Sequence, residues 1–157
     1  MNAKNRRTFL KKGVAASAAV AAGGAAMAQE SSGKPEKKVL TAEGKPPDPN
    51  KQSLFSSTVL YGNLVFIAGV GAHVAPFEIK AHTEIVLNSI KSQLEAVGSS
   101  MDKVLKCSVF LADLKDYAGM NEVFKGRFGK EPPVRTTVAV SGVPGNSLVE
   151  IDVIAYI

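Results

Sequence analysis

The sequence predicts an α+β fold in which two helices cover one face of a six-stranded sheet. Six segments show the alternation of apolar and polar residues that is typical of strands. Two further segments carry apolar residues every three or four positions, which is the helical period. Each helical segment has only one apolar stripe, so each is expected to pack against a sheet on that side alone. Together these patterns predict one layer of helices on one layer of sheet.

Residues 1–28 are predicted to be an export signal outside this fold. Arg6 and Arg7 precede an alanine-rich, weakly hydrophobic run at 13–27, and Ala26-Met27-Ala28 has the small residues of a cleavage site. The pattern resembles a twin-arginine signal, which carries folded proteins across a bacterial inner membrane. We therefore expect a periplasmic protein. Stable membrane association is not expected, because the run is too short and too rich in Ala and Gly to be a stable membrane span. An uncleaved anchor is the alternative.

Removal of this signal would change the charge of the chain. The signal holds five of the 19 basic residues and no acidic residue, which leaves 14 basic residues against 14 acidic ones. A nearly neutral mature chain removes the electrostatic basis for binding nucleic acid. Cys107 alternates with polar residues and is predicted to be a core thiol rather than a nucleophile. No metal site is expected, because His73 and His82 have no partner at ligand spacing.

The main domain is predicted to span residues 53–157, after a linker and edge segment at 29–52. Glycines at positions 98 and 129 are suited to end the two helices, and Asp113 or Asp116 is suited to cap the second helix. The predicted strands are 38–41, 53–60, 64–68, 103–112, 134–140 and 149–155, and the predicted helices are 76–97 and 117–128.

The last two predicted strands carry the candidate site. If the apolar rows of 134–140 and 149–155 face a common core, alternation places Arg135, Thr137 and Glu150 together on the other face. One interpretation is an ion pair on a wet sheet face, worth about 0–1 kcal/mol. The other is a site in which Arg135 grips a substrate carboxylate with its planar fork and Glu150 acts on a water molecule.

The second face of the sheet predicts self-association. Ala68, Phe110, Ala139 and Ile154 are expected there, and they are too apolar to be left fully wet, yet no third helix exists to cover them. Uncovered apolar area of this kind usually marks an interface, so we expect a homo-oligomer built through this face. The candidate site would then lie beside a subunit boundary, in clefts that one chain alone cannot form.

Several segments, which are specific only when taken together, resemble one known family. They are Tyr61-Gly62-Asn63-Leu64-Val65-Phe66, Leu94-Glu95-Ala96-Val97-Gly98, VLKCSVFL at 104–111, DLKDY at 113–117 with Asn121-Glu122, PVRTTV at 133–138 and VEIDVIA at 149–155. Over residues 53–157 the chain resembles the Rid family of reactive intermediate deaminases, also called YjgF-like.

This resemblance implies a chorismate-mutase-like fold that assembles as a homotrimer with clefts between subunits. It also implies hydrolysis of 2-aminoacrylate-type enamines, or their imine tautomers, to 2-keto acids and ammonia without a cofactor. Arg135 matches the family arginine that holds the substrate carboxylate, and Glu150 matches the glutamate that positions or activates water. An imine carbon is already electrophilic, so orientation and one polarised water suffice for the reaction.

Two positions depart from the deaminating members of that family. Phe55 and Ala68 stand where those members usually carry a tyrosine and a serine, so the pocket loses two hydroxyl groups. Thr137, Asn121 and Ser108 are the candidates to replace them. The alternative to a deaminase is therefore a non-catalytic module that binds a small carboxylate in the same clefts. A holdase-like role through apolar surface is a third hypothesis.

Overall fold

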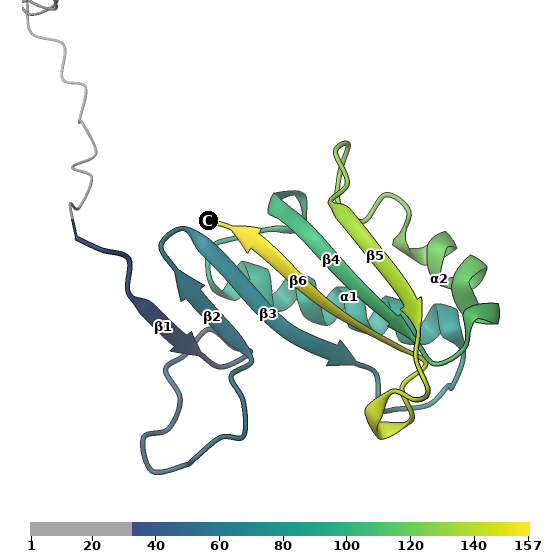
Figure 1. Ribbon diagram of the computed structural model, residues 1–157, viewed down its shortest axis with the longest axis horizontal. Helices are drawn as coiled ribbons and strands as arrows, with labels where there is room; N and C mark the ends of the chain where they lie inside the picture. The colour runs from purple at the N-terminus through teal and green to yellow at the C-terminus, as the bar shows by residue number, and fades with distance from the viewer. Residues whose placement is uncertain (1–32) are drawn as a thin grey trace, which may run out of the picture. The chain divides into compact units, whose positions relative to one another are not determined.

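A mixed sheet with the strand order β1-β2-β3-β6-β4-β5 forms the scaffold of the computed structural model, which describes residues 33–157 (Figure 1). The predicted export signal lies outside the described residues. The predicted α+β class, with six strands and two helices, is confirmed. The strands are β1 Lys37–Leu40, β2 Thr58–Tyr61, β3 Leu64–Gly71, β4 Val104–Leu111, β5 Val134–Ala139 and β6 Val149–Tyr156, and the helices are α1 Ile79–Ala96 and α2 Tyr117–Phe124.

Strand pairing puts the two candidate strands in different environments. Every neighbouring pair is antiparallel except β4 and β5, which run parallel. Strand β6 lies between β3 and β4, in the middle of the sheet, whereas β5 forms an edge. Glu150 on β6 therefore has neighbours on both sides, and Arg135 on β5 has a neighbour on one side only.

Both helices lie on the same side of the sheet, as predicted (Figure 1). Helix α1 packs across β3 and β6 and also contacts α2. The buried His82 ties α1 to two loops, because its Nδ1 accepts from the Leu148 N–H at 3.1 Å and its Nε2 donates to the Val74 carbonyl at 3.0 Å. The core between helices and sheet includes Val65, Ile90, Leu94, Val109, Met120, Ile151 and Val153.

Several element boundaries differ from the predictions, and strand β3 runs three residues further than expected, to Gly71. Strand β2 begins at Thr58 rather than at residue 53, and the segment before it is tied to the sheet by one bond, from the Ala68 N–H to the Ser57 carbonyl at 3.0 Å. Helix α1 begins three residues after Pro76. Helix α2 ends at Phe124, because the chain then turns through glycines at 126 and 129, which have positive φ angles of 80° and 78°.

The orientation of β5 is opposite to the prediction. Its register aligns Arg135 with Cys107 and Thr137 with Val109, whose side chains point into the core. Paired residues of neighbouring strands share a face, so Arg135 and Thr137 lie on the helix side. Ala139 lies there too, because it pairs with Leu111, and it does not belong to the open face as predicted.

The open face of the sheet carries the apolar row that was expected in the core. Val134 is 71% exposed and Val138 is 42% exposed, and Phe66 and Ile154 lie on the same face. An apolar, uncovered sheet face was predicted, and the structure confirms it: Phe110 and Ile154 lie there as predicted, while Val134 and Val138 take the place expected for Ala139. Within residues 33–157, no helix is long and apolar enough to cross a membrane.

Candidate functional site

Arg135 lies against α2, and aromatic rings surround its guanidinium. The guanidinium carbon is 4.6 Å from the centre of the Phe124 ring and 5.8 Å from that of Tyr117. One Nη donates to the Tyr117 hydroxyl at 3.4 Å, and the other lies 3.9 Å from the Met120 sulfur. None of the ion pairs in the described part of the chain involves Arg135. The result is a half-buried cation without a carboxylate partner.

A cleft of about 460 Å³ opens beside this arginine. Asn121 and Phe124 of α2 line it on one side, and Pro132 and Pro133, which lead into β5, line it on the other. The two prolines restrict the backbone just before Arg135, so the arginine enters its strand from a stiff segment. The structure thus brings together two of the predicted site residues, Arg135 and Asn121.

Thr137 follows two residues later on the same face of β5. Its Oγ1 atom is buried and has no hydrogen-bond partner among the described residues. A buried hydroxyl without a partner costs stability, so such a group often marks a position that a ligand or water completes. The inner face of the edge strand therefore offers a free cation and a free hydroxyl next to each other.

Glu150 lies on the other face of the sheet and in a separate cleft of about 190 Å³, lined also by Phe110 and Pro144. It pairs with Gly71 in a part of β3 where the register shifts between Ile67 and Val70. The Glu150 side chain packs directly over Gly69, where a Cβ atom would collide with the carboxylate. A glycine at this position is therefore what lets the carboxylate approach β3.

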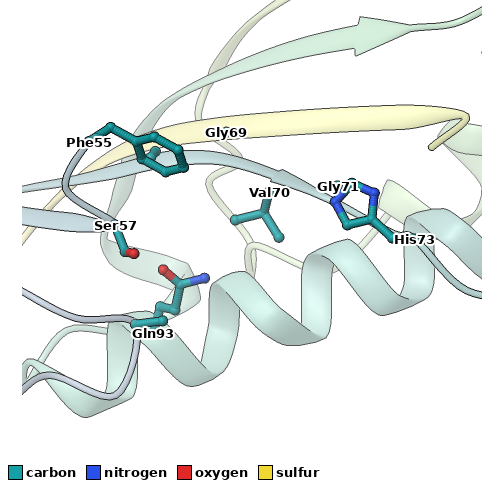
Figure 2. Close-up of a pocket in the computed structure, with 9 residues that line it drawn as sticks. Phe55, Ser57, Gly69, Val70, Gly71, His73 and Gln93 are labelled. Atoms are coloured by element: carbon teal, nitrogen blue, oxygen red, sulfur yellow. The ribbon is translucent and has the colours of Figure 1, made fainter. Parts of the chain in front are cut away.

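Phe55 and Ala68 line a third cavity, of about 210 Å³ (Figure 2). Its floor is the Gly69-Val70-Gly71 segment, and His73 and Gln93 stand at its ends. Figure 2 shows Phe55 and Gln93 at one end and the His73 ring at the other. The two positions that lost a hydroxyl thus do share a pocket.

The prediction that Arg135 and Glu150 share one face of the sheet is wrong. They lie on opposite faces, and β4 separates their strands, so the backbones are at least about 10 Å apart. The prediction failed because it assumed that the valine row of β5 faces the core. Of the predicted site residues, Arg135, Asn121 and Thr137 lie on the helix side of β5, Phe55 and Ala68 lie at the cavity beside β3, and Glu150 lies on the open face.

Cys107 is a core thiol, as predicted. It is fully buried, and burial raises its pKa to about 12; the nearby charge of Arg135 lowers the pKa, and that of Asp152 raises it further. A thiol with this pKa stays protonated at neutral pH and is a poor nucleophile. Among the residues that the structure describes, no group of three or more His, Cys, Asp or Glu side chains is arranged to hold a metal ion.

Comparison with known proteins shows the family. A family model described as endoribonuclease L-PSP matches residues 47–157. The chain belongs to this Rid (YjgF, L-PSP) family. A RutC family protein of Pyrococcus horikoshii is 41% identical over 108 residues, which are 65% of this chain and 86% of the relative. The mitochondrial protein mmf2 of Schizosaccharomyces pombe is 34% identical over 108 residues, 64% of this chain and 86% of the relative.

Solved structures of the Rid family share this fold. RidA of the Antarctic bacterium Psychrobacter superposes with a TM-score of 0.67 at 33% identity and covers 76% of this chain and 99% of its own. Yeast Mmf1 gives a TM-score of 0.68 at 28% identity, with coverage of 77% and 98%. The resemblance noted in the sequence is thus confirmed at the level of family and fold.

Proposed function

We propose that this protein is a homotrimeric hydrolase that converts small enamine or imine carboxylates into 2-keto acids and ammonia. The observation that carries the proposal is the Arg135 guanidinium, which is held against the Phe124 and Tyr117 rings without a carboxylate partner in residues 33–157. A half-buried guanidinium without a counter-ion is suited to an anion, and its planar fork matches a carboxylate. Membership in the Rid family supports this assignment.

The site is proposed to form between copies of the chain. Arg135 and Glu150 lie on opposite faces of one sheet, so a single copy cannot apply both to one small substrate. We place Arg135 and Thr137 of one copy against the cavity of Phe55 and Ala68 in the next copy, where Glu150 reaches the Gly69 segment. The exposed valine row of β5 and the open sheet face supply apolar area for such an assembly.

The chemistry follows from these positions. Arg135 holds the substrate carboxylate and so fixes the adjacent C2 atom. Glu150 accepts a proton from a water molecule while the water oxygen forms a bond to C2 of the imine. That proton then passes to the nitrogen and gives a carbinolamine. The hydroxyl proton of this intermediate moves to the nitrogen, the C–N bond breaks as the C=O bond forms, and ammonia leaves. The reaction consumes one water and yields one keto acid and one ammonia, with no redox change and no cofactor.

A non-catalytic module that binds small carboxylates is the second candidate. It is favoured by the cavity wall itself, since neither Phe55 nor Ala68 can donate a hydrogen bond to a substrate nitrogen. Such a module would bind 2-keto acids through Arg135 without turnover. Calorimetric titration with pyruvate, run beside the activity assay, distinguishes this candidate from the hydrolase.

The decisive assay measures ammonia and keto acid released from freshly generated 2-iminopropanoate. We expect Arg135→Ala to lose at least 100-fold in rate, as is usual when a charged group that orients the substrate is removed. Arg127→Ala is the matched control, because Arg127 is the other arginine of residues 33–157, does not line the cleft and has its Nη1 paired with Glu84 at 2.8 Å. A wild-type rate no higher than that of buffer would end the deaminase proposal.

Export to the periplasm is a further part of the proposal and rests on the paired Arg6 and Arg7 and on the Ala26-Met27-Ala28 site. Fractionation of bacterial cells that express the full chain tests it. The mature protein should appear in the periplasmic fraction, and replacement of both arginines by lysine should retain it in the cytoplasm.

A further inference from the structure

His73 stands at the end of the cavity that Phe55 and Ala68 line, and the hydrogen bonds of its ring are asymmetric. Its Nδ1 lies 3.2 Å from the Gly145 carbonyl oxygen. The Nε2 atom has no hydrogen-bond partner among the described residues, and the ring is directed toward Val70 along the cavity (Figure 2).

The Gly145 contact fixes the tautomer of the ring. A carbonyl oxygen can only accept, so Nδ1 carries the proton and donates it. In a neutral imidazole the other nitrogen is then an acceptor, and Nε2 presents a lone pair. Gly145 has a φ of 66°, and a Cβ atom there would collide with Nδ1, so the glycine allows the carbonyl and the ring to meet.

His73 and Glu150 approach the same short stretch of β3 from different elements. The Glu150 carboxylate packs over Gly69, and the His73 ring packs over Gly71, where a Cβ atom would lie 3.4 Å from Nε2. The two glycines therefore let an acid and an imidazole approach the same stretch of β3, with His73 in the cavity of Phe55 and Ala68 and Glu150 in the neighbouring cleft. The pocket that lost two hydroxyl groups at Phe55 and Ala68 thus keeps a polar side chain at one end, His73, while Ser57 and Gln93 line it further along.

We infer that His73 is a substrate-positioning residue whose Nε2 accepts a hydrogen bond from the amino or imino N–H of the ligand. The inference rests on the proposed carboxylate site at Arg135 and specifies which ligands that site prefers. A lone pair at Nε2 favours a ligand with an N–H next to its carboxylate. It makes no hydrogen bond with a keto acid, because the keto oxygen can only accept. His73 thus supplies the contact to nitrogen that neither Phe55 nor Ala68 can make.

Two stable ligands test this preference directly. Oxamate is planar and carries an NH₂ group next to its carboxylate, as 2-aminoacrylate does, whereas pyruvate has a methyl group in that place. In calorimetric titrations of the full chain, we expect oxamate to bind more tightly than pyruvate. In His73→Phe this preference should fall by roughly three- to tenfold, which is the effect of one hydrogen bond.

Three variants make the result specific. His73→Gln retains an acceptor oxygen and should keep part of the preference. Val74→Ala, beside His73 but outside the cavity lining, should keep all of it. Arg135→Ala should lose both ligands. If Arg135→Ala loses both ligands but His73→Phe keeps the full preference, the inference fails and the carboxylate site stands. If the wild-type protein binds neither ligand, both proposals fail.

A second readout does not depend on the folding of any variant. The chain has two histidines, so its ¹H–¹³C spectrum has two Cε1–H signals to follow. Saturating oxamate should shift the His73 signal, while His82, whose two ring nitrogens are both bonded inside the core, serves as the internal reference. Oxamate that binds without moving the His73 signal overturns the inference.

Discussion

The guanidinium carbon of Arg135 lies 4.6 Å from the centre of the Phe124 ring. This relationship joins the edge strand to the short helix above it, and it places a cation against a nearly buried aromatic face. The ring holds the guanidinium by cation–π attraction and by apolar contact with its flat surface. The ring contact uses none of the N–H donors of the guanidinium, so those that do not donate to the Tyr117 hydroxyl or face the Met120 sulfur stay available for a ligand.

The role of the Phe124 ring can be tested by a substitution that keeps an apolar side chain at this position. Phe124→Leu should weaken pyruvate binding by about three- to tenfold, because a cation–π contact of about 0.5–2 kcal/mol no longer orients the guanidinium. The comparison is Phe128→Leu, because Phe128 is also buried and lines the same cleft, but the rings that face Arg135 are those of Phe124 and Tyr117. Both variants should lose similar stability to urea. Equal affinities in the two variants would contradict the proposed role of the ring.

Gly69→Ala should uncouple binding from turnover. A Cβ atom at this position would collide with the Glu150 carboxylate and displace it. We expect kcat for 2-iminopropanoate to fall by at least about 100-fold, in the range usual for loss of a general base, while pyruvate still binds through Arg135. Glu150→Gln should give the same pattern, because it keeps the shape of the side chain and removes its charge. Normal turnover in either variant would show that Glu150 does not activate the attacking water.

The open face of the sheet should be the surface through which copies associate. Val138 is 42% exposed on that face, and Val138→Glu would put a charge into a buried interface at a cost of several kcal/mol. Sedimentation velocity should show a trimer for the wild-type chain and a monomer for the variant. Leu114→Glu, at a leucine that is 62% exposed in the turn before α2, is the control and should remain a trimer. A trimeric Val138→Glu protein would locate the interface on another surface.

Cys107 should make stability depend on pH in the alkaline range. Burial raises the pKa of this thiol from 9.0 to about 12, so the unfolded chain loses the thiol proton in a window where the folded chain keeps it. The unfolded state then binds fewer protons, and the free energy of unfolding falls as pH rises above about 9, with a slope of at most about 1.4 kcal/mol per pH unit. Below that pH the contribution is fully present.

Urea unfolding of the wild-type chain and of Cys107→Ala between pH 8 and pH 10.5 measures this effect. The alanine variant should be less stable throughout because of the cavity that it leaves, but its stability should fall less steeply with pH. Parallel curves for the two proteins would show that the thiol does not contribute to the pH dependence.

The helices and the central strands could be predicted well from the sequence, because burial imposes a clear period on them. Val86, Ile90 and Leu94 recur at four-residue steps on α1 and are all buried. On β6, the alternation of buried Val149, Ile151 and Val153 with half-buried neighbours is equally plain. For such elements only one face can meet the core, and the pattern identifies that face.

The edge strand could not be oriented in this way. Its period-2 pattern shows two different faces but does not say which one points inward, and a shift of one residue exchanges them. On β5 the valine row is the exposed one, and the half-buried face carries Arg135 and Thr137 under α2. The roles of both residues could be suggested from their chemistry, but their separation from Glu150 follows from the register with β4.

His73, in a loop after β3, belongs to no periodic pattern, so only the structure places it at the cavity.

The placement of Arg135 and Glu150 on opposite faces has a genetic consequence under the proposed assembly. Each site takes Arg135 from one subunit and Glu150 from another. A mixture of Arg135→Ala and Glu150→Gln chains, each inactive by itself, therefore forms some sites that contain both residues. By the same reasoning, a defective copy that lacks only one of the two residues lowers activity in proportion to its gene dose, whereas a copy that lacks both lowers activity by more, because each site then needs two normal chains.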